Sequence, residues 1–185
     1  MLRILLIILL LTWYNKCVKA QIVYRSYNFI GVVAGEAKSA YQVLTTHGIQ
    51  HRSWYAGIGA GIDDYRNRTV PLFVSIVKQV LPQNNMFVNI NAGTQFIWGK
   101  NERHTLWNAV DSKAFPGFLG EAGIGYRLPV GKDGQGMMFG TYYSYKSFRE
   151  KFTVVGICNN PPCENMTEYI DSKFNRWAFK VGFVF

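Results

Sequence analysis

Three residues in one polar stretch are of the types that nucleophilic catalysis uses. His104, Asp111 and Ser112 would suit acyl transfer, for example onto or from a lipid. Nothing in their spacing enforces a triad, and a solvated loop naturally contains such residues. We therefore expect that the protein is not an enzyme. The alternative is an enzyme at the rim of the fold, in which alanine at the three positions would abolish lipid modification.

Two cysteines near the C-terminus could form a covalent cross-link. Cys158 and Cys163 flank the run Asn-Asn-Pro-Pro. In an exported protein, two nearby cysteines favour a disulfide. Closing so short a loop would stabilise it by roughly 2–3 kcal/mol. A metal would need further ligands, and none stands out, so we expect neither a metal nor a cofactor.

Charged residues recur opposite aromatic ones in the second half of the chain. They are Glu121, Arg127, Lys146, Arg176 and Lys180. If each segment is a strand, parity places all five on the face opposite the bulky apolar side chains. Opposite charges facing a narrow interior would form a hydrogen-bonded network that plugs it, because unpaired buried charge is costly. A narrow path for ions or protons is the alternative, and a bilayer conductance measurement would reveal it. Asp63, Asp64 or Glu36 could balance the excess of cations.

The last ten residues, RWAFKVGFVF, indicate which elements carry these charges. Bulky apolar residues alternate with small or charged ones, a period of two that predicts a strand with lipid on one side. A final strand that ends on phenylalanine is also similar to the C-terminal insertion signal of bacterial outer-membrane barrels. The residues that would form this signal are Trp177, Phe179, Val181, Phe183 and Phe185.

Similar alternation recurs along the chain, in segments close to the ~10 residues that a tilted strand needs to cross a bilayer. The pattern predicts an all-β, eight-stranded, antiparallel up-and-down transmembrane barrel. A soluble eight-stranded barrel of the lipocalin kind is the alternative. The predicted strands are residues 26–35, 40–48, 54–65, 69–80, 87–98, 117–128, 137–148 and 174–185.

The N-terminus predicts export. Arg3 precedes an apolar run from Ile4 to Leu11, too short to span a bilayer as a helix, and Val18-Lys19-Ala20 follows it. We expect residues 1–20 to be a signal peptide cleaved after Ala20, and residues 21–185 to form one outer-membrane barrel domain. The residues before Cys17 are wrong for lipid attachment. Cleavage would lower the formal net charge from +9 to +6, since it removes three cations and no acid.

Loop lengths orient the predicted barrel. With the N-terminus in the periplasm, the short connections 47–53, 82–85 and 129–136 fall inside. The two longest, residues 99–114 and 153–172, fall outside as surface loops, which is the asymmetry expected of such barrels. Basic residues are scattered rather than clustered, so we expect no nucleic acid partner.

Residues 40–76 carry a specific resemblance. An alternating-glycine strand (Gly57, Gly59, Gly61) ends in Asp63 and Tyr65, and a polar loop and Pro71-Leu72-Phe73 follow. This order resembles the outer-membrane β-barrel domain family abundant in Bacteroidetes-type bacteria. The resemblance implies an eight-stranded outer-membrane barrel and, for most members, no established activity. The two cysteines are not part of that pattern. The glycines themselves would make room for bulky neighbours such as Phe73 or Tyr142.

These observations predict an integral, monomeric outer-membrane barrel with a structural or surface-interaction role, adhesin-like or envelope-stabilising. Its expected partners are outer-membrane lipids, the barrel-insertion machinery during biogenesis, and an extracellular or envelope protein that binds residues 99–114 and 153–172. A rim enzyme, a narrow channel and an accessory barrel of a secretion system are the other hypotheses.

Overall fold

The computed structural model describes residues 22–35, 39–64, 68–80, 85–98, 109–130, 134–155 and 165–185. The predicted signal peptide and both cysteines of the expected disulfide lie outside these residues. Among the described residues no helix is long and apolar enough to cross a membrane. All regular elements in this part are strands: β1 (Ile22–Val33), β2 (Ala40–His51), β3 (Trp54–Asp63), β4 (Thr69–Gln79), β5 (Met86–Ile97), β6 (Ala109–Ala114), β7 (Gly117–Pro129), β8 (Gly136–Val155) and β9 (Asn165–Val184).

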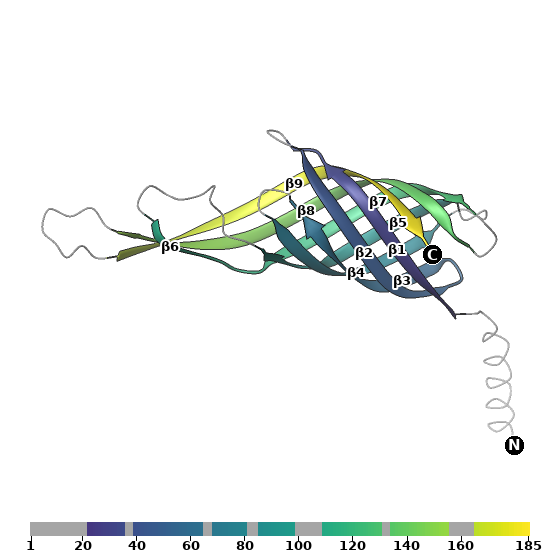
Figure 1. Ribbon diagram of the computed structural model, residues 1–185, viewed down its shortest axis with the longest axis horizontal. Helices are drawn as coiled ribbons and strands as arrows, with labels where there is room; N and C mark the ends of the chain where they lie inside the picture. Colours follow the sequence, from purple (N-terminus) through teal and green to yellow (C-terminus); the bar gives the residue numbers. More distant parts are fainter. Residues whose placement is uncertain are drawn as a thin grey trace, which may run out of the picture.

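Eight of the strands close into an antiparallel barrel, as the alternation predicts (Figure 1). Each strand pairs with the next one around the ring, and β9 returns to pair with β1 between Ala178 and Val184. A path along the pairs starts at Ile22 and comes back to β1 at Val32, so the sheet closes with a stagger of ten residues. Such a stagger accompanies a strand tilt of about 35–45° and an interior that side chains can fill.

The strands form because one side of each is apolar and the other is small, polar or aromatic. Outward residues include Ile58, Val74 and Phe179, which are 72%, 53% and 58% exposed. Aromatic side chains gather toward both ends of this outer surface, as they do at the two membrane interfaces of transmembrane barrels. Tyr24, Trp54, Tyr126 and Phe185 lie toward the end that holds the chain termini; Tyr41, Phe96, Phe118, Tyr143 and Trp177 lie toward the opposite end.

The connections from β2 to β3, from β4 to β5 and from β7 to β8 lie at the end of the barrel where β1 begins and β9 ends (Figure 1). Here the structure corrects the predicted bounds: residues 47–51 belong to β2, and the turn to β3 is only Arg52 and Ser53. Arg52 has a positive φ of 55°, which a two-residue hairpin often requires at its first turn position. Strand β1 starts four residues earlier than predicted, at Ile22, and ends at Val33.

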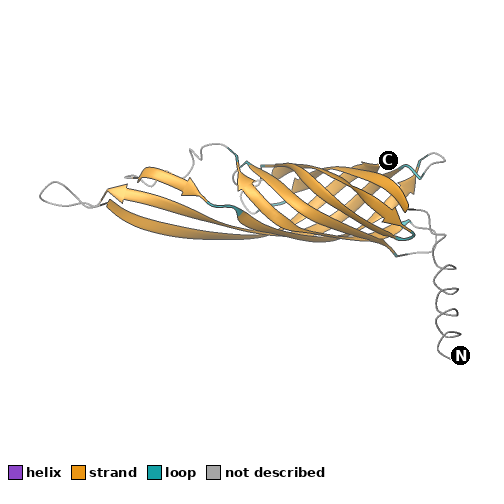
Figure 2. Ribbon diagram, turned by 90° about the horizontal axis from the view of Figure 1, so that it is seen from below, coloured by secondary structure: helices purple, strands orange, loops and turns teal. Residues whose placement is uncertain are grey.

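At the opposite end of the barrel, the structure corrects the bounds of the two predicted surface loops. β8 and β9 each run 20 residues and continue past the barrel as a long hairpin (Figures 1 and 2). Residues 153–155 and 165–172 are therefore strand, and residues 109–114 form β6. β6 pairs with β8 from Glu150 to Val154, and the hydrogen bond from Phe115 N to Arg149 O links it to the ladder of β7. Outside the bilayer, the outward-facing residues of a strand do not have to be apolar. The hydrophobic alternation in the sequence therefore ends before the strands do.

Candidate functional site

The barrel interior holds two buried ion pairs, one above the other along the axis. Lys180 on β9 pairs with Glu121 on β7, and Lys146 on β8 pairs with Asp63 on β3. All four side chains are almost fully excluded from solvent. Alternation places them inward, and the closure of the sheet brings strands that are distant in sequence to face one another across the lumen.

Amides surround the Glu121 pair. Asn91 Nδ2 donates to Glu121 Oε1 at 3.0 Å, and Asn89 Nδ2 donates to Asn91 Oδ1 at 3.2 Å and to Ser75 Oγ at 3.0 Å. The Nζ atom of Lys180 also lies 4.5 Å from the ring centroid of Tyr142. The carboxylate and the ammonium thus have fixed polar neighbours, which a buried charged pair needs in order to persist.

The Asp63–Lys146 pair lies nearer the end of the barrel from which β8 and β9 project. Gln42 Nε2 donates to Asp63 Oδ2 at 3.1 Å, and the same oxygen accepts a hydrogen bond from Lys146. The backbone oxygen of Asp63 accepts from Thr69 Oγ1 at 3.4 Å, which ties the first residue of β4 to the last residue of β3. Asp63 is one of the three acids that could balance the predicted cations, and it contacts Lys146; Glu36 lies outside the described residues.

The remaining two predicted lumen charges, Arg127 and Arg176, are in neither of these two pairs. Arg127, which is 9% exposed, donates to the backbone oxygen of Gly134 near the turn end of the barrel. Arg176 is half-buried, and its guanidinium carbon lies 5.8 Å from the centroid of the Phe174 ring. Of the five charged residues, the structure therefore brings Glu121 and Lys180 into one pair, and joins Lys146 to an acid outside the predicted set.

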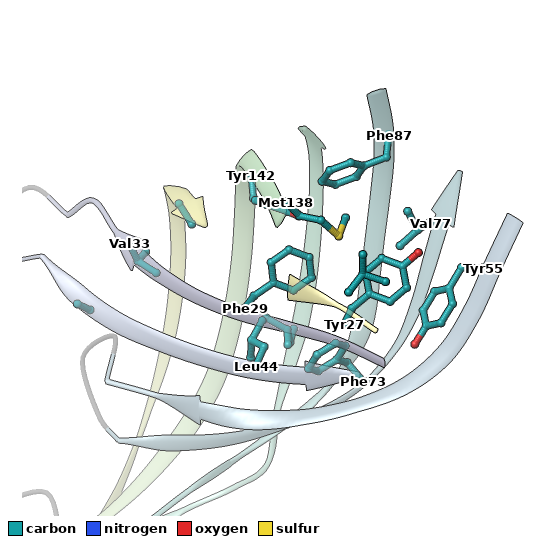
Figure 3. Close-up of a cluster of buried hydrophobic side chains, with 14 residues drawn as sticks. Tyr27, Phe29, Val33, Leu44, Tyr55, Phe73, Val77, Phe87, Met138 and Tyr142 are labelled. Atoms are coloured by element: carbon teal, nitrogen blue, oxygen red, sulfur yellow. The ribbon is translucent and has the colours of Figure 1, made fainter. Parts of the chain in front are cut away.

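Aromatic rings from several strands gather in the interior of the barrel (Figure 3). The centroids of the Tyr27 and Tyr55 rings are 4.4 Å apart, and those of Phe29 and Tyr142 are 6.3 Å apart. Leu44, Phe73, Val77, Phe87 and Met138 belong to the same cluster, and all are buried. These rings and the two ion pairs together line the interior of the barrel, and Lys180 contacts both groups.

Inward-facing glycines receive these rings. A Cβ atom on Gly59 would lie 2.6 Å from the Phe73 ring, so only glycine leaves space for that side chain. Phe73 is one of the neighbours that the glycine spacing predicts. Tyr142 instead lies over Gly123, and Phe87 lies over Gly125. Glycine and a ring on the neighbouring strand thus form one packing unit, which also permits strong strand coiling.

The described residues hold no group of three or more potential metal ligands. The interior of the barrel is an arrangement of paired charges, amides and packed rings. His104 lies outside the described residues, as do Cys158 and Cys163; for Asp111 and Ser112 the structure describes only the backbone, in β6.

The C-terminal residues of the predicted insertion signal all lie on the outer surface. Trp177, Phe179, Val181, Phe183 and Phe185 are between 44% and 58% exposed. The Trp177 ring packs edge to face on Tyr143 of β8, with centroids 5.3 Å apart. These residues therefore form one continuous apolar stripe, which ends at the last residue of the chain.

Sequence reasoning missed an ion pair on the hairpin beyond the barrel. Arg149 donates from Nε and Nη2 to the two carboxylate oxygens of Asp171, at 2.6 and 2.9 Å. This hydrogen bonding lowers the pKa of Asp171 and raises the pKa of Arg149. The register between β8 and β9 makes the two residues direct neighbours. The sequence gives no signal for this pair, because both residues lie outside the predicted strands.

A closed eight-stranded sheet with an apolar outer face and a polar and aromatic interior defines the fold of small outer-membrane barrels. The chain is similar to the crystal structure of the outer membrane protein OprG from Pseudomonas aeruginosa, with a TM-score of 0.51 and 15% identity. The match covers 90% of this chain and 95% of that one, and at this identity it shows the fold.

No family model matches the chain, and no curated protein matches it. The comparisons thus support the small outer-membrane barrel fold but not the particular Bacteroidetes-type family that residues 40–76 resemble.

Proposed function

We propose that the protein is an integral barrel of the outer membrane with a closed lumen, and that it acts through the sheet that projects beyond the barrel. The apolar outer face with aromatic residues toward both ends supports the membrane location. A predicted signal peptide and the outer-membrane origin of the structural neighbour favour it as well. In this location, the expected partners of the protein are outer-membrane lipids and, during biogenesis, the barrel-insertion machinery.

One observation favours a surface role over a role in transport. The lumen holds two buried ion pairs above a cluster of packed rings, whereas β8 and β9 extend well past the barrel. A chain that fills its interior and lengthens two strands outside it places its distinctive surface in the extracellular space. The outer face of β9 above Trp177 also changes from apolar to polar, with Asn175, Lys173 and Asp171 in succession.

Conductance in a planar bilayer tests the closed lumen. We expect no resolved current steps from the purified protein under conditions in which an added porin conducts. Regular steps whose ion selectivity changes in a Glu121→Gln variant would contradict the closed lumen and favour a narrow channel.

Complementation tests the surface role. Cells that lack the protein receive either the full chain or a variant in which a short turn replaces residues 150–170, so that Arg149 and Asp171 remain paired. The full chain should restore the phenotype of the loss, and the shortened variant should not. Equal restoration by both would indicate an envelope-stabilising role for the barrel alone.

A further inference from the structure

The outer face of the projecting sheet changes in composition just above the apolar surface of the barrel. β6, β8 and the outer part of β9 lie side by side there (Figure 2). The first rows above the apolar surface are aromatic: Tyr143 packs on Trp177, and the Phe118 ring lies 6.2 Å from that of Tyr145. The rows above these are basic. Alternation places four cations on the same face as the rings: Lys113, Arg149, Lys151 and Lys173.

Two of these cations stand directly opposite each other. Lys113 on β6 is the register partner of Lys151 on β8. Like charges in directly opposite positions destabilise a sheet. An anion between the two ammonium groups would turn this repulsion into attraction. The register therefore creates a position on this face in which a negatively charged ligand is favoured.

The acids on this face do not balance the cations. Asp171 already accepts two hydrogen bonds from Arg149, and the charge of Lys173 helps to lower the pKa of Asp171. By alternation Asp111 is the other acid on this face, and the structure describes only its backbone. Four cations thus share the face with two acids. Among the described side chains, none of the three lysines forms a salt bridge.

A hollow of about 510 Å³ lies at the level of these cations, where β7 takes the place of β6 beside β8. Its lining includes Phe115, Phe118, Arg149 and Lys173. Lys113 lies close by, since its Nζ atom is 5.7 Å from the centroid of the Phe115 ring. The hollow thus combines apolar rings with cations, which are the two kinds of group that an amphipathic anion contacts.

The spacing of the cations indicates how large this anion is. Lys173 lies four residues from Tyr169 along β9, and Tyr169 is the register partner of Lys151. At about 3.3 Å per residue, the basic rows extend over about 13 Å along the strands. A headgroup with a single phosphate would cover one such row, whereas a headgroup of phosphorylated sugars has phosphates at several levels. The position directly above aromatic rows favours a lipid, because basic residues beside a membrane surface attract anionic headgroups.

We propose that this basic face, formed by Lys113, Arg149, Lys151 and Lys173, binds the phosphate groups of a phosphorylated glycolipid in the leaflet from which the sheet projects. The bound headgroups would surround the base of the projecting sheet and hold it in one orientation above the barrel. This inference rests on the membrane location in the proposed function, and it adds a lipid ligand that a surface role does not by itself require.

Lipid binding in detergent micelles tests the proposal with the full mature chain. The probes are rough lipopolysaccharide with a phosphorylated core, the same preparation after chemical removal of its phosphates, phosphatidylglycerol, and inorganic polyphosphate. Isothermal titration calorimetry in a nonionic detergent measures each dissociation constant. The phosphorylated lipopolysaccharide should bind about tenfold or more tightly than any of the other three probes.

Neutralisation of the opposed lysines tests the position of the site. The double variant Lys113→Gln with Lys151→Gln should weaken binding of the phosphorylated lipopolysaccharide by about tenfold or more, since two cations are lost. The matched control is Arg52→Gln with Lys78→Gln, which removes the same net charge at the opposite end of the barrel. The control should bind like the wild type. Every variant is first checked for the unboiled gel mobility of the folded barrel.

Four results would overturn the proposal. The first two are equal binding of phosphorylated and dephosphorylated lipopolysaccharide, and wild-type affinity in the Lys113→Gln, Lys151→Gln variant. Equally tight binding of polyphosphate would assign the face to a soluble polyanion, and equally tight binding of phosphatidylglycerol would contradict the match to several phosphates. Failure of the membrane location would appear separately, in the fractionation of cells, and neither conductance nor complementation depends on these titrations.

Discussion

At the scale of single residues, the interior depends on pairs that compensate each other. Glu121 and Lys180 are both almost fully buried, so each would be an uncompensated charge without the other. Gly59 and Phe73 depend on each other in shape rather than in charge. Parity alone could predict that Glu121 and Lys180 face inward. It could not predict that Asp63 contacts Lys146, because that contact depends on the accumulated register of several strands.

Replacement of Lys180 tests the charge pair. Lys180→Met should lower the free energy of unfolding by about 3–5 kcal/mol, because it leaves the Glu121 carboxylate buried without its cation. The double variant Glu121→Gln with Lys180→Met should recover most of this loss. Urea unfolding in detergent micelles measures both, with the exposed Lys173→Met as the control. A loss below about 1 kcal/mol for Lys180→Met would mean that the pair is not buried as the structure has it.

Replacement of Gly59 tests the packing of ring against glycine. Gly59→Ala should destabilise the barrel by about 1–3 kcal/mol, since its Cβ atom would overlap the Phe73 ring. A second change, Phe73→Leu, should cost less in the Gly59→Ala background than in the wild type. Ala60→Val, on the outer face of the same strand, serves as the control. Additive losses for Gly59→Ala and Phe73→Leu would argue against direct contact.

At the scale of elements, the sequence predicts the strands that cross the membrane, because apolar and polar residues alternate there. It does not predict the strand segments outside the membrane, where this alternation is absent. The eight spanning segments were identified because every second residue faces outward and is apolar. The upper parts of β8 and β9 carry polar residues on both faces, as in Thr167, Glu168 and Asp171, so the hydrophobic pattern predicts a loop there. β6 was missed for the same reason.

Acidification should loosen the projecting hairpin. The Arg149 hydrogen bonds lower the pKa of Asp171 below its unfolded value. The stabilisation is therefore complete above the unfolded pKa of about 4 and is lost as the pH falls through the lower folded pKa. Amide hydrogen exchange of residues 165–171 should rise relative to the barrel strands over that range. Asp171→Asn should remove this pH dependence; if the variant keeps it, another group is responsible.

The C-terminal stripe of β9 should matter for insertion more than for stability. Phe185 is 57% exposed on the outer face, so Phe185→Ala removes little packing. We expect the variant to refold in detergent like the wild type but to accumulate several-fold less in the outer membrane of cells. Quantitative immunoblots of membrane fractions measure this. Equal accumulation would contradict a role for the stripe in recognition by the insertion machinery.

At the scale of the whole molecule, the number of strands follows from counting alternating segments, whereas the stagger of ten residues does not. The stagger is the sum of eight registers, each fixed by turns and by contacts such as the ring over Gly59, and no single segment contains it. This closure sets the width of the lumen and therefore decides that paired charges and rings can fill it. The same closure leaves β8 and β9 free to continue beyond the other strands.

The most direct test of this account is the gel mobility of the protein from isolated outer-membrane fractions, with and without boiling. A closed transmembrane barrel resists detergent at room temperature, so we expect the unboiled protein to stay in the membrane fraction and to migrate differently from the boiled protein. A protein that appears in the soluble periplasmic fraction, with the same mobility before and after boiling, would contradict the account and indicate a soluble barrel.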